Sequence, residues 1–481
     1  MTMSDDVLPD REPRTRSLLL AGGRASLALG AAAAGAALVA GVVLVPGPML
    51  APTVPAVAVT PDRSDQSLVC AGGALGLTRG VDPQVAVVAP ERRHTSGAGL
   101  VTSTLTTSDA VDGSTVVVTL PREAPGDALA ATGIVQPDTT EVSGLAAAEC
   151  LSPTRTSWLV GGSTTVGRTS WIVLSNADAV DAVVDLTLWG DAGPIDAVGT
   201  TGIIVAAGAQ RIVPLAGIAV DEPSPVVRVS STGGSVAATL QTSIVRGLTP
   251  SGVSIVTPIN EPALRHVIPA LPVINGRVAL ERSTADGGAD GLPALRLLAP
   301  GDIAAQVTVR LVPIEGGVGL VTEATLEPGV VLDLPVTNLA DGEYGVIVDA
   351  TEPIVVAGRT STAGTSAAGV ETADVEWFTP SPALAAGTEV LIAVAPVDNT
   401  QRAFVQVIAP NAGAEVTIDG LPVTIAAGGM VVVSSAADAG VRLSTTGVVH
   451  VSVSYRGDGL LAGSRVLAPP SAAGALTVLP Q

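Results

Sequence analysis

The chain has 481 residues, of which 47% are hydrophobic, 14% are charged and 2% are aromatic. Its formal net charge is −20, and every one of its 24 basic residues is arginine. The lack of lysine excludes a Schiff-base lysine and a P-loop lysine. The acidic excess repels phosphate groups, which argues against nucleic-acid binding. The apolar residues are mostly Ala, Val, Leu and Ile, a composition that suits β-strands.

The N-terminal part of the chain predicts a membrane anchor. Residues 25–45 form an uncharged apolar run that is long enough to cross a bilayer as a helix. We therefore predict a cytoplasmic tail over 1–24, a transmembrane helix over 25–46 and contact with the lipid bilayer through 25–45. Four arginines precede the run and the next is Arg63. This asymmetry places the N-terminus in the cytoplasm and the bulk of the chain outside the cell.

A cleaved signal peptide is the alternative, and the protein would then be secreted. The small residues Ala56-Val57-Ala58 offer a cleavage site. However, that site lies well beyond the apolar run, and the run is longer than a usual signal core, so a retained single-pass anchor is favoured. Residues 47–64 are rich in proline and predict an extended linker between the membrane and the first domain.

The two cysteines of the chain, Cys70 and Cys150, both follow the apolar segment. An even pair in an exported protein predicts one disulfide, within a β-domain over 65–155. Two free buried thiols are the alternative reading of this pair.

Beyond the linker, short apolar runs alternate with turn residues at the spacing typical of β-sandwiches, and no segment shows a convincing helical stripe. A repeat occurs three times, each copy with a strand, a hairpin turn ending in glycine, a strand and a final hairpin. The glycines are Gly208, Gly329 and Gly428. The fold predicted is all-β, with tandem immunoglobulin-like β-sandwich domains after one transmembrane helix. These sandwich domains are predicted over 156–262, 263–370 and 371–469, followed by a tail over 470–481.

Four short motifs carry a family resemblance. They are LVC at 68–70, GLAAAEC at 144–150, SWLVGG at 157–162 and IVLSNAD at 172–178. The chain resembles an actinobacterial family of exported proteins often labelled "large secreted protein" (domain of unknown function family 5719). The resemblance implies an exported protein built of repeated units, and it implies no activity. In that family proline commonly follows each cysteine, whereas Ala71 and Leu151 stand here.

The sequence shows no catalytic, cofactor-binding or metal-binding motif. The three histidines, His94, His266 and His450, are far apart, and neither H-E-x-x-H nor G-x-S-x-G occurs. A serine nucleophile, a metal site and a small-molecule cofactor are therefore not expected.

Four weaker features remain. Glu371, Asp374 and Glu376 precede Trp377 and could form a carboxylate pair for glycan hydrolysis. Trp158, Trp171 and Trp189 could form a glycan-binding strip, although we expect Trp171 and Trp189 in the core. The loop 286–291 hints at calcium, but a solvated loop is the expectation. The adhesion tripeptide Arg456-Gly457-Asp458 is read as ordinary turn chemistry.

These observations predict a non-enzymatic, membrane-tethered extracytoplasmic protein with a structural or protein-interaction role in the cell envelope. An unidentified envelope protein is the expected partner. A glycan-binding or glycan-hydrolysing envelope protein is the alternative, and it would use the acidic residues beside Trp377.

Overall fold

The computed structural model describes residues 57–59, 64–78, 81–125, 128–285, 291–314, 319–336, 339–365, 369, 371–468 and 476–478. The chain divides into two compact units, Met1–Asp62 with Ala472–Gln481, and Arg63–Ser471. In the smaller unit, β1 (Val57–Val59) pairs antiparallel with β34 (Leu476–Val478).

Several predictions concern residues outside the described ranges. They are the cytoplasmic tail, the helix over 25–46, most of the linker, residues 286–290 of the loop considered for calcium, and most of the tail over 470–481. Within the described part of the chain, no helix has the length and apolar character needed to span a bilayer.

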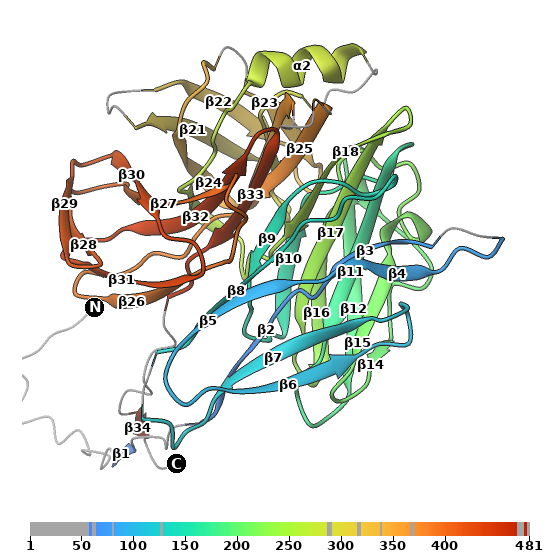
Figure 1. The fold of residues 1–481 in the computed structure, drawn as a ribbon, viewed down its shortest axis with the longest axis horizontal. Helices are drawn as coiled ribbons and strands as arrows, with labels where there is room; N and C mark the ends of the chain where they lie inside the picture. The colour runs from blue at the N-terminus through green and yellow to red at the C-terminus, as the bar shows by residue number, and fades with distance from the viewer. Residues whose placement is uncertain are drawn as a thin grey trace, which may run out of the picture. The chain divides into compact units, whose positions relative to one another are not determined.

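The larger unit is all-β, as predicted, and we divide it into four modules (Figure 1). Module 1 contains three small antiparallel sheets, with the orders β2-β7-β6, β3-β4 and β5-β8-β9. Its strands are β2 (Gln66–Val69), β3 (Ala74–Leu77), β4 (Val85–Ala89), β5 (Arg92–Ser96), β6 (Val101–Thr106), β7 (Ser114–Leu120), β8 (Ala130–Val135) and β9 (Ala146–Glu149).

Module 2 consists of two antiparallel sheets whose buried side chains share one core. Leu186 and Val229 come from one sheet and Ile172 and Leu240 from the other. The elements are β10 (Thr156–Val160), β11 (Arg168–Ser175), β12 (Ala182–Gly190), β13 (Gly193–Ile195), β14 (Ile203–Val205), β15 (Gln210–Pro214), the 3-10 helix η1 (Leu215–Gly217), β16 (Val226–Gly233), β17 (Ala237–Arg246) and β18 (Thr249–Val256).

Modules 3 and 4 each enclose a core of the same kind. Module 3 contains β19 (Ala263–Ile268), α2 (Gly276–Ala285), β20 (Ala294–Leu298), β21 (Ala305–Pro313), β22 (Val321–Leu326), β23 (Leu332–Pro335), β24 (Tyr344–Thr365) and β25 (Glu371–Phe378). Module 4 contains β26 (Glu389–Val394), β27 (Arg402–Ala409), β28 (Ala414–Ile418), β29 (Leu421–Ile425), β30 (Gly429–Ser435), β31 (Ala439–Thr445), β32 (His450–Gly457) and β33 (Leu460–Arg465).

Modules 2, 3 and 4 share one strand order. In module 2, the first layer has the order β10-β16-β12-β14 and the second has the order β15-β11-β17-β18. In module 4, the corresponding orders are β26-β31-β28-β29 and β30-β27-β32-β33. In module 3, the long strand β24 runs through both layers. It pairs with β19 and β21 along its first part and with β20 and β25 along its second.

This order corrects the predicted hairpins. Gly208, Gly329 and Gly428 do lie in turns, with φ angles of 69°, 70° and 69°. However, the two strands beside each glycine belong to different layers, so each glycine connects two sheets. The predicted final hairpin of each copy likewise spans two layers. Alternation along a strand reveals which residues face the core, but it does not identify the neighbouring strand.

A second correction is α2, which the sequence pattern did not predict. Asp341 accepts hydrogen bonds from the amides of Asn275 and Gly276, both at 3.0 Å, where the helix begins. One exposed ion pair, Arg277–Glu281 at 2.5 Å, follows the helix surface. The helix start is thus stabilised by a carboxylate 65 positions away, which no local capping pattern announces.

The last strands of the four modules meet at one junction. In cyclic order, β9 contacts β18, β18 contacts β25, β25 contacts β33 and β33 contacts β9. The predicted boundary between 370 and 371 falls between β24 and β25, which pair with each other along eight residues of β25. By strand order, β25 is the last strand of module 3. This places the acidic segment of β25 at the junction.

Candidate functional site

The acidic cluster before Trp377 lies on β25, in the middle of the four-strand junction. Asp374 and Glu376 are two residues apart, so they project to the same face of the strand. Both side chains are buried, with exposed fractions of 1% and 0%, whereas Glu371 is exposed at the start of the strand. The structure therefore brings together two of the three predicted carboxylates and separates them from solvent.

Asp374 accepts hydrogen bonds from four backbone amides. Its Oδ2 accepts from Leu145 at 2.7 Å and from Leu461 at 3.1 Å. Its Oδ1 accepts from Val253 at 3.1 Å and from Val375 at 3.0 Å. These donors belong to all four modules. Burial raises the pKa of Asp374 well above its usual value, and the four amides oppose that increase because they favour the charged form.

Glu376 connects modules 2 and 3. Its Oε1 accepts a hydrogen bond from the Ser254 hydroxyl at 2.7 Å and another from the Trp377 amide at 2.9 Å. Burial raises the pKa of Glu376 well above its usual value, and the charge of Asp374 adds to this increase. The pair resembles two catalytic carboxylates in composition, but both Asp374 oxygens and Glu376 Oε1 accept from backbone and hydroxyl donors in the interior, and the buried Oε2 of Glu376 has no hydrogen-bond partner among the described residues.

Trp377 projects to the opposite face of β25 and joins the core of module 2. The guanidinium carbon of Arg296 lies 4.6 Å from its ring centroid, and that of Arg359 lies at 5.5 Å. Arg296 is 1% exposed and forms an ion pair with Asp333 at 2.8 Å. Burial acts to raise the pKa of Asp333, but the charge and hydrogen bonds of Arg296 and the charge of Arg359 lower it overall. The indole is thus enclosed by cations and does not offer a sugar platform.

A second buried ion pair connects the first and last modules. Arg465 on β33 donates from Nε to Glu149 Oε1 at 2.7 Å, and its backbone amide donates to Oε2 at 2.9 Å. Both side chains are less than a tenth exposed. Because the carboxylate is matched by two donors of one residue, it stays satisfied without water. This pair closes the ring of modules at the contact between β9 and β33.

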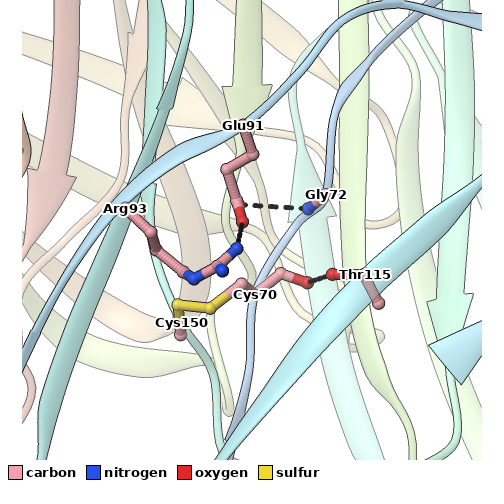
Figure 2. Close-up of a disulfide and its surroundings, with 6 residues drawn as sticks. All are labelled: Cys70, Gly72, Glu91, Arg93, Thr115 and Cys150. Carbon is pink, nitrogen blue, oxygen red and sulfur yellow. Dashed lines mark hydrogen bonds and ion pairs between the residues drawn. A yellow bond between two sulfur atoms is a disulfide. The ribbon is translucent and has the colours of Figure 1, made fainter. Parts of the chain in front are cut away.

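The predicted disulfide between Cys70 and Cys150 is confirmed, and Figure 2 shows its surroundings. It joins the residues that follow β2 and β9, and both cysteines are buried. The Thr115 hydroxyl donates to the Cys70 carbonyl at 2.7 Å. Nearby, Glu91 accepts from Arg93 at 2.5 Å and from the Gly72 amide at 3.2 Å. The bridge therefore fixes the end of β9, one of the four junction strands.

A model of a family of unknown function (DUF5719) matches residues 105–451, which is more than half of the chain. The chain belongs to this family. The matched range includes Cys150 and the buried pair on β25, and it excludes Cys70 and Arg465. A search of curated proteins finds no match to this DUF5719 protein.

Three solved structures show distant likeness to the DUF5719 protein. Thermotoga maritima 1070 is 16% identical with a TM-score of 0.18, and the match covers 24% of this chain and 93% of that chain. An anti-sigma factor domain-containing protein is 8% identical with a TM-score of 0.12, covering 72% and 84%. Another, from Clostridium clariflavum, is 7% identical with a TM-score of 0.11, covering 85% and 98%. At these TM-scores the three likenesses indicate neither a shared fold nor a shared function.

The histidines of the DUF5719 protein lie apart from the carboxylate pair. His94 contacts Asp438 at 2.9 Å and connects module 1 to module 4. His266 and His450 each contact a backbone carbonyl at 2.7 Å. Burial lowers the pKa of both. Within the described ranges, no three His, Cys, Asp or Glu side chains gather as metal ligands.

The adhesion tripeptide and the tryptophans also have internal partners. Arg456 forms a bidentate pair with Glu343, and Asp458 accepts from the Thr365 amide at 3.3 Å, so the turn is docked on module 3. Trp158 stacks on Trp189 with centroids 5.2 Å apart in the core of module 2. Trp171 is buried as well, in a cluster shared with module 1.

Sequence reasoning missed Arg296, Glu149 and Arg465. Arg296 stands inside an otherwise apolar strand, ALRLL, and this is the one local sign of a buried pair. Glu149 directly precedes Cys150 in an alanine-rich strand. Because lone charges in apolar strands need a partner when buried, such positions identify candidates for ion pairs. The identity of the partner depends on strand packing.

Proposed function

We propose that this DUF5719 protein is a non-enzymatic, membrane-tethered extracytoplasmic protein with a structural or protein-interaction role in the cell envelope. The observation that supports this proposal best is the set of hydrogen bonds that Asp374 accepts. A carboxylate from the one acidic cluster considered for hydrolysis accepts amides from all four modules. In the fold, this carboxylate therefore joins the modules through hydrogen bonds.

The repeated architecture supports the same proposal. We infer that modules 2, 3 and 4 are immunoglobulin-like sandwiches in tandem, since each has two layers of strands around one core and all three share one strand order. Rigid β-modules of this kind present edges and loops to other proteins. The buried disulfide is consistent with an oxidising compartment outside the cytoplasm.

The test of the function is co-purification. Tagged full-length protein is extracted from membranes in mild detergent, and bound proteins are identified by mass spectrometry. The variant Glu371→Gln, which changes the exposed carboxylate of the acidic cluster before Trp377, is purified in the same way to test whether that carboxylate is needed for binding. A protein partner recovered with both forms supports the proposal. Retention or cleavage of envelope polysaccharide by the full-length protein would instead identify the glycan-directed function.

The location has a separate test. Intact cells are treated with a membrane-impermeant protease, and the chain is followed with antibodies to residues before 24 and after 64. We expect loss of the downstream epitope and protection of the N-terminal one. Protection of both epitopes in intact cells, with digestion only after lysis, would contradict an extracytoplasmic location.

A further inference from the structure

Strand β6 is an unprotected outer strand of module 1. It lies at the end of the sheet β2-β7-β6 and pairs with β7, from Val101 opposite Thr119 to Thr106 opposite Ser114 (Figure 1). On its other side, among the described residues, one bridge joins Thr106 to Ala209. Five of its six residues are exposed. The main-chain groups along the free side of β6 are thus open to pairing.

The sequence of β6, VTSTLT, contains neither a charge nor a proline. Outer strands usually carry such residues because they prevent pairing with another chain. Several outer strands of the other modules carry such a residue, with Pro214 in β15, Glu323 in β22 and Pro422 in β29. In module 2, β10 and β14 carry neither, but four of the five residues of β10 are buried and β14 has only three residues. Strand β30 lacks both devices, but Ser434 is its single exposed residue. β6 therefore combines exposure with a sequence that favours strand addition.

We propose that β6 binds an extended segment of a partner protein, which adds as a fourth strand to the sheet β2-β7-β6. This inference rests on the proposed interaction function and names its surface. Main-chain hydrogen bonds along the free side of β6 supply the affinity. The small side chains of Thr102, Ser103 and Thr104 leave space for the alternating residues of the added strand.

The net charge of the chain and the size of the site indicate the occupant. This chain carries a net charge of −20, so a partner segment with basic residues beside its strand is attracted, and a second copy of the chain is repelled. A six-residue strand is also only about 20 Å long. Its edge alone falls well short of the roughly 1,200 Å² that a stable dimer buries. Both arguments favour a basic-flanked extended peptide over self-association.

The experiment uses full-length protein in detergent and a labelled peptide, KTVTVTVTVK. Binding is followed by fluorescence anisotropy, and hydrogen exchange is measured over residues 101–106. Two control peptides are ETVTVTVTVE, with reversed charge, and KTVTPTVTVK, with a proline at a pairing position. We expect binding by the first peptide, slower exchange in β6, and at least about tenfold weaker binding of both controls.

Protein variants locate the site. Ser103→Lys places a charge on β6 and should weaken peptide binding about tenfold or more. Thr325→Lys makes the same change on β22 and should leave binding unchanged. The backbone amides of consecutive residues in β6 point alternately toward β7 and toward the free side of the strand. Of the two variants Ser103→Pro and Thr104→Pro, one therefore removes an amide on the free side. That variant should keep the wild-type melting temperature and lose binding.

Equal binding by the wild type and Ser103→Lys, or no binding of the peptide at all, would overturn the inference. So would a dimer, seen by sedimentation, that Ser103→Lys dissociates, because the occupant would then be a second copy. A co-purified envelope protein that persists in Ser103→Lys would also overturn it, while leaving the proposed function intact. The two proposals can therefore fail independently.

Discussion

The Asp374 carboxylate accepts a hydrogen bond from the Leu145 amide at 2.7 Å, across 229 positions of the chain. The same side chain also accepts amides of β18 and β33. One residue of module 3 thus holds main-chain groups of modules 1, 2 and 4. We expect the four modules to unfold together rather than one at a time.

Replacement of Asp374 by alanine tests this relationship. The variant leaves several buried amides without an acceptor, and each unsatisfied donor costs about 1–3 kcal/mol. We expect Asp374→Ala to lower the free energy of unfolding by about 4 kcal/mol or more and to reduce cooperativity. Urea denaturation followed by tryptophan fluorescence measures both. Glu371→Gln on the same strand is the control, with an expected change below about 0.5 kcal/mol. Similar midpoints for the two variants would refute the assignment.

The raised pKa of Glu376 predicts a pH dependence of stability. The folded state keeps a proton on Glu376 that the unfolded state releases above about pH 4.5. Stability from this group is therefore full at low pH and is lost as pH rises through the raised pKa. His266 and His450 act in the opposite sense, because their lowered pKa values cost stability below about pH 6.5.

Glu376→Gln isolates the carboxyl contribution. The amide cannot release a proton, so the fall in the free energy of unfolding between pH 5 and pH 8 should be smaller than in the wild type. Asp374 keeps part of the slope, since its pKa is raised as well. Urea denaturation at several pH values gives the two curves. Parallel curves for the two proteins would show that Glu376 is not protonated in the fold.

The disulfide should contribute substantially to stability. Its cysteines are 80 positions apart, and closing a loop of that length is worth about 4 kcal/mol in the chain-entropy account. We expect the double variant Cys70→Ala with Cys150→Ala to lose about that amount in guanidinium denaturation. Reductant should then have no further effect on the variant. A wild type and double variant of equal stability would show that packing alone holds β9 in place.

Gly428 tests the turns between sheets. Its φ angle is 69°, and an added Cβ would meet no atom within 4 Å, so any cost is conformational. We expect Gly428→Ala to lower stability by about 1 kcal/mol and Gly428→Asn to lower it less. Gly217→Ala is the control, since Gly217 has no positive φ and its nearest atom lies at 3.9 Å. Equal melting temperatures for the two alanine variants would count against the turn assignment.

Sequence reasoning reached the local features of this protein. The short apolar runs between turn residues predicted strands. In one of these strands Val307, Val309 and Leu311 are buried and the residues between them are not, because side chains of a strand alternate between two faces. The three glycines marked real turns, since each needs a positive φ. The cysteine pair predicted the disulfide from an even count in a chain that we expected to be exported. Each of these signals resides in a few neighbouring residues or in composition.

The neighbours of each strand and the residues that meet at the junction depend on contacts between distant parts of the chain. Whether the chain turned back as a hairpin at Gly208 or crossed to another layer depended on packing between distant strands, which alternation does not encode. The same holds for Asp374. Its sequence neighbours suggested a reactive cluster, but three of its four amide donors come from other modules, and their convergence buries the carboxylate. Strands, turns and the disulfide could be predicted before the fold was known, because these follow from local geometry and composition. Only the fold determined the role of the acidic pair, because burial is a property of the whole assembly of strands.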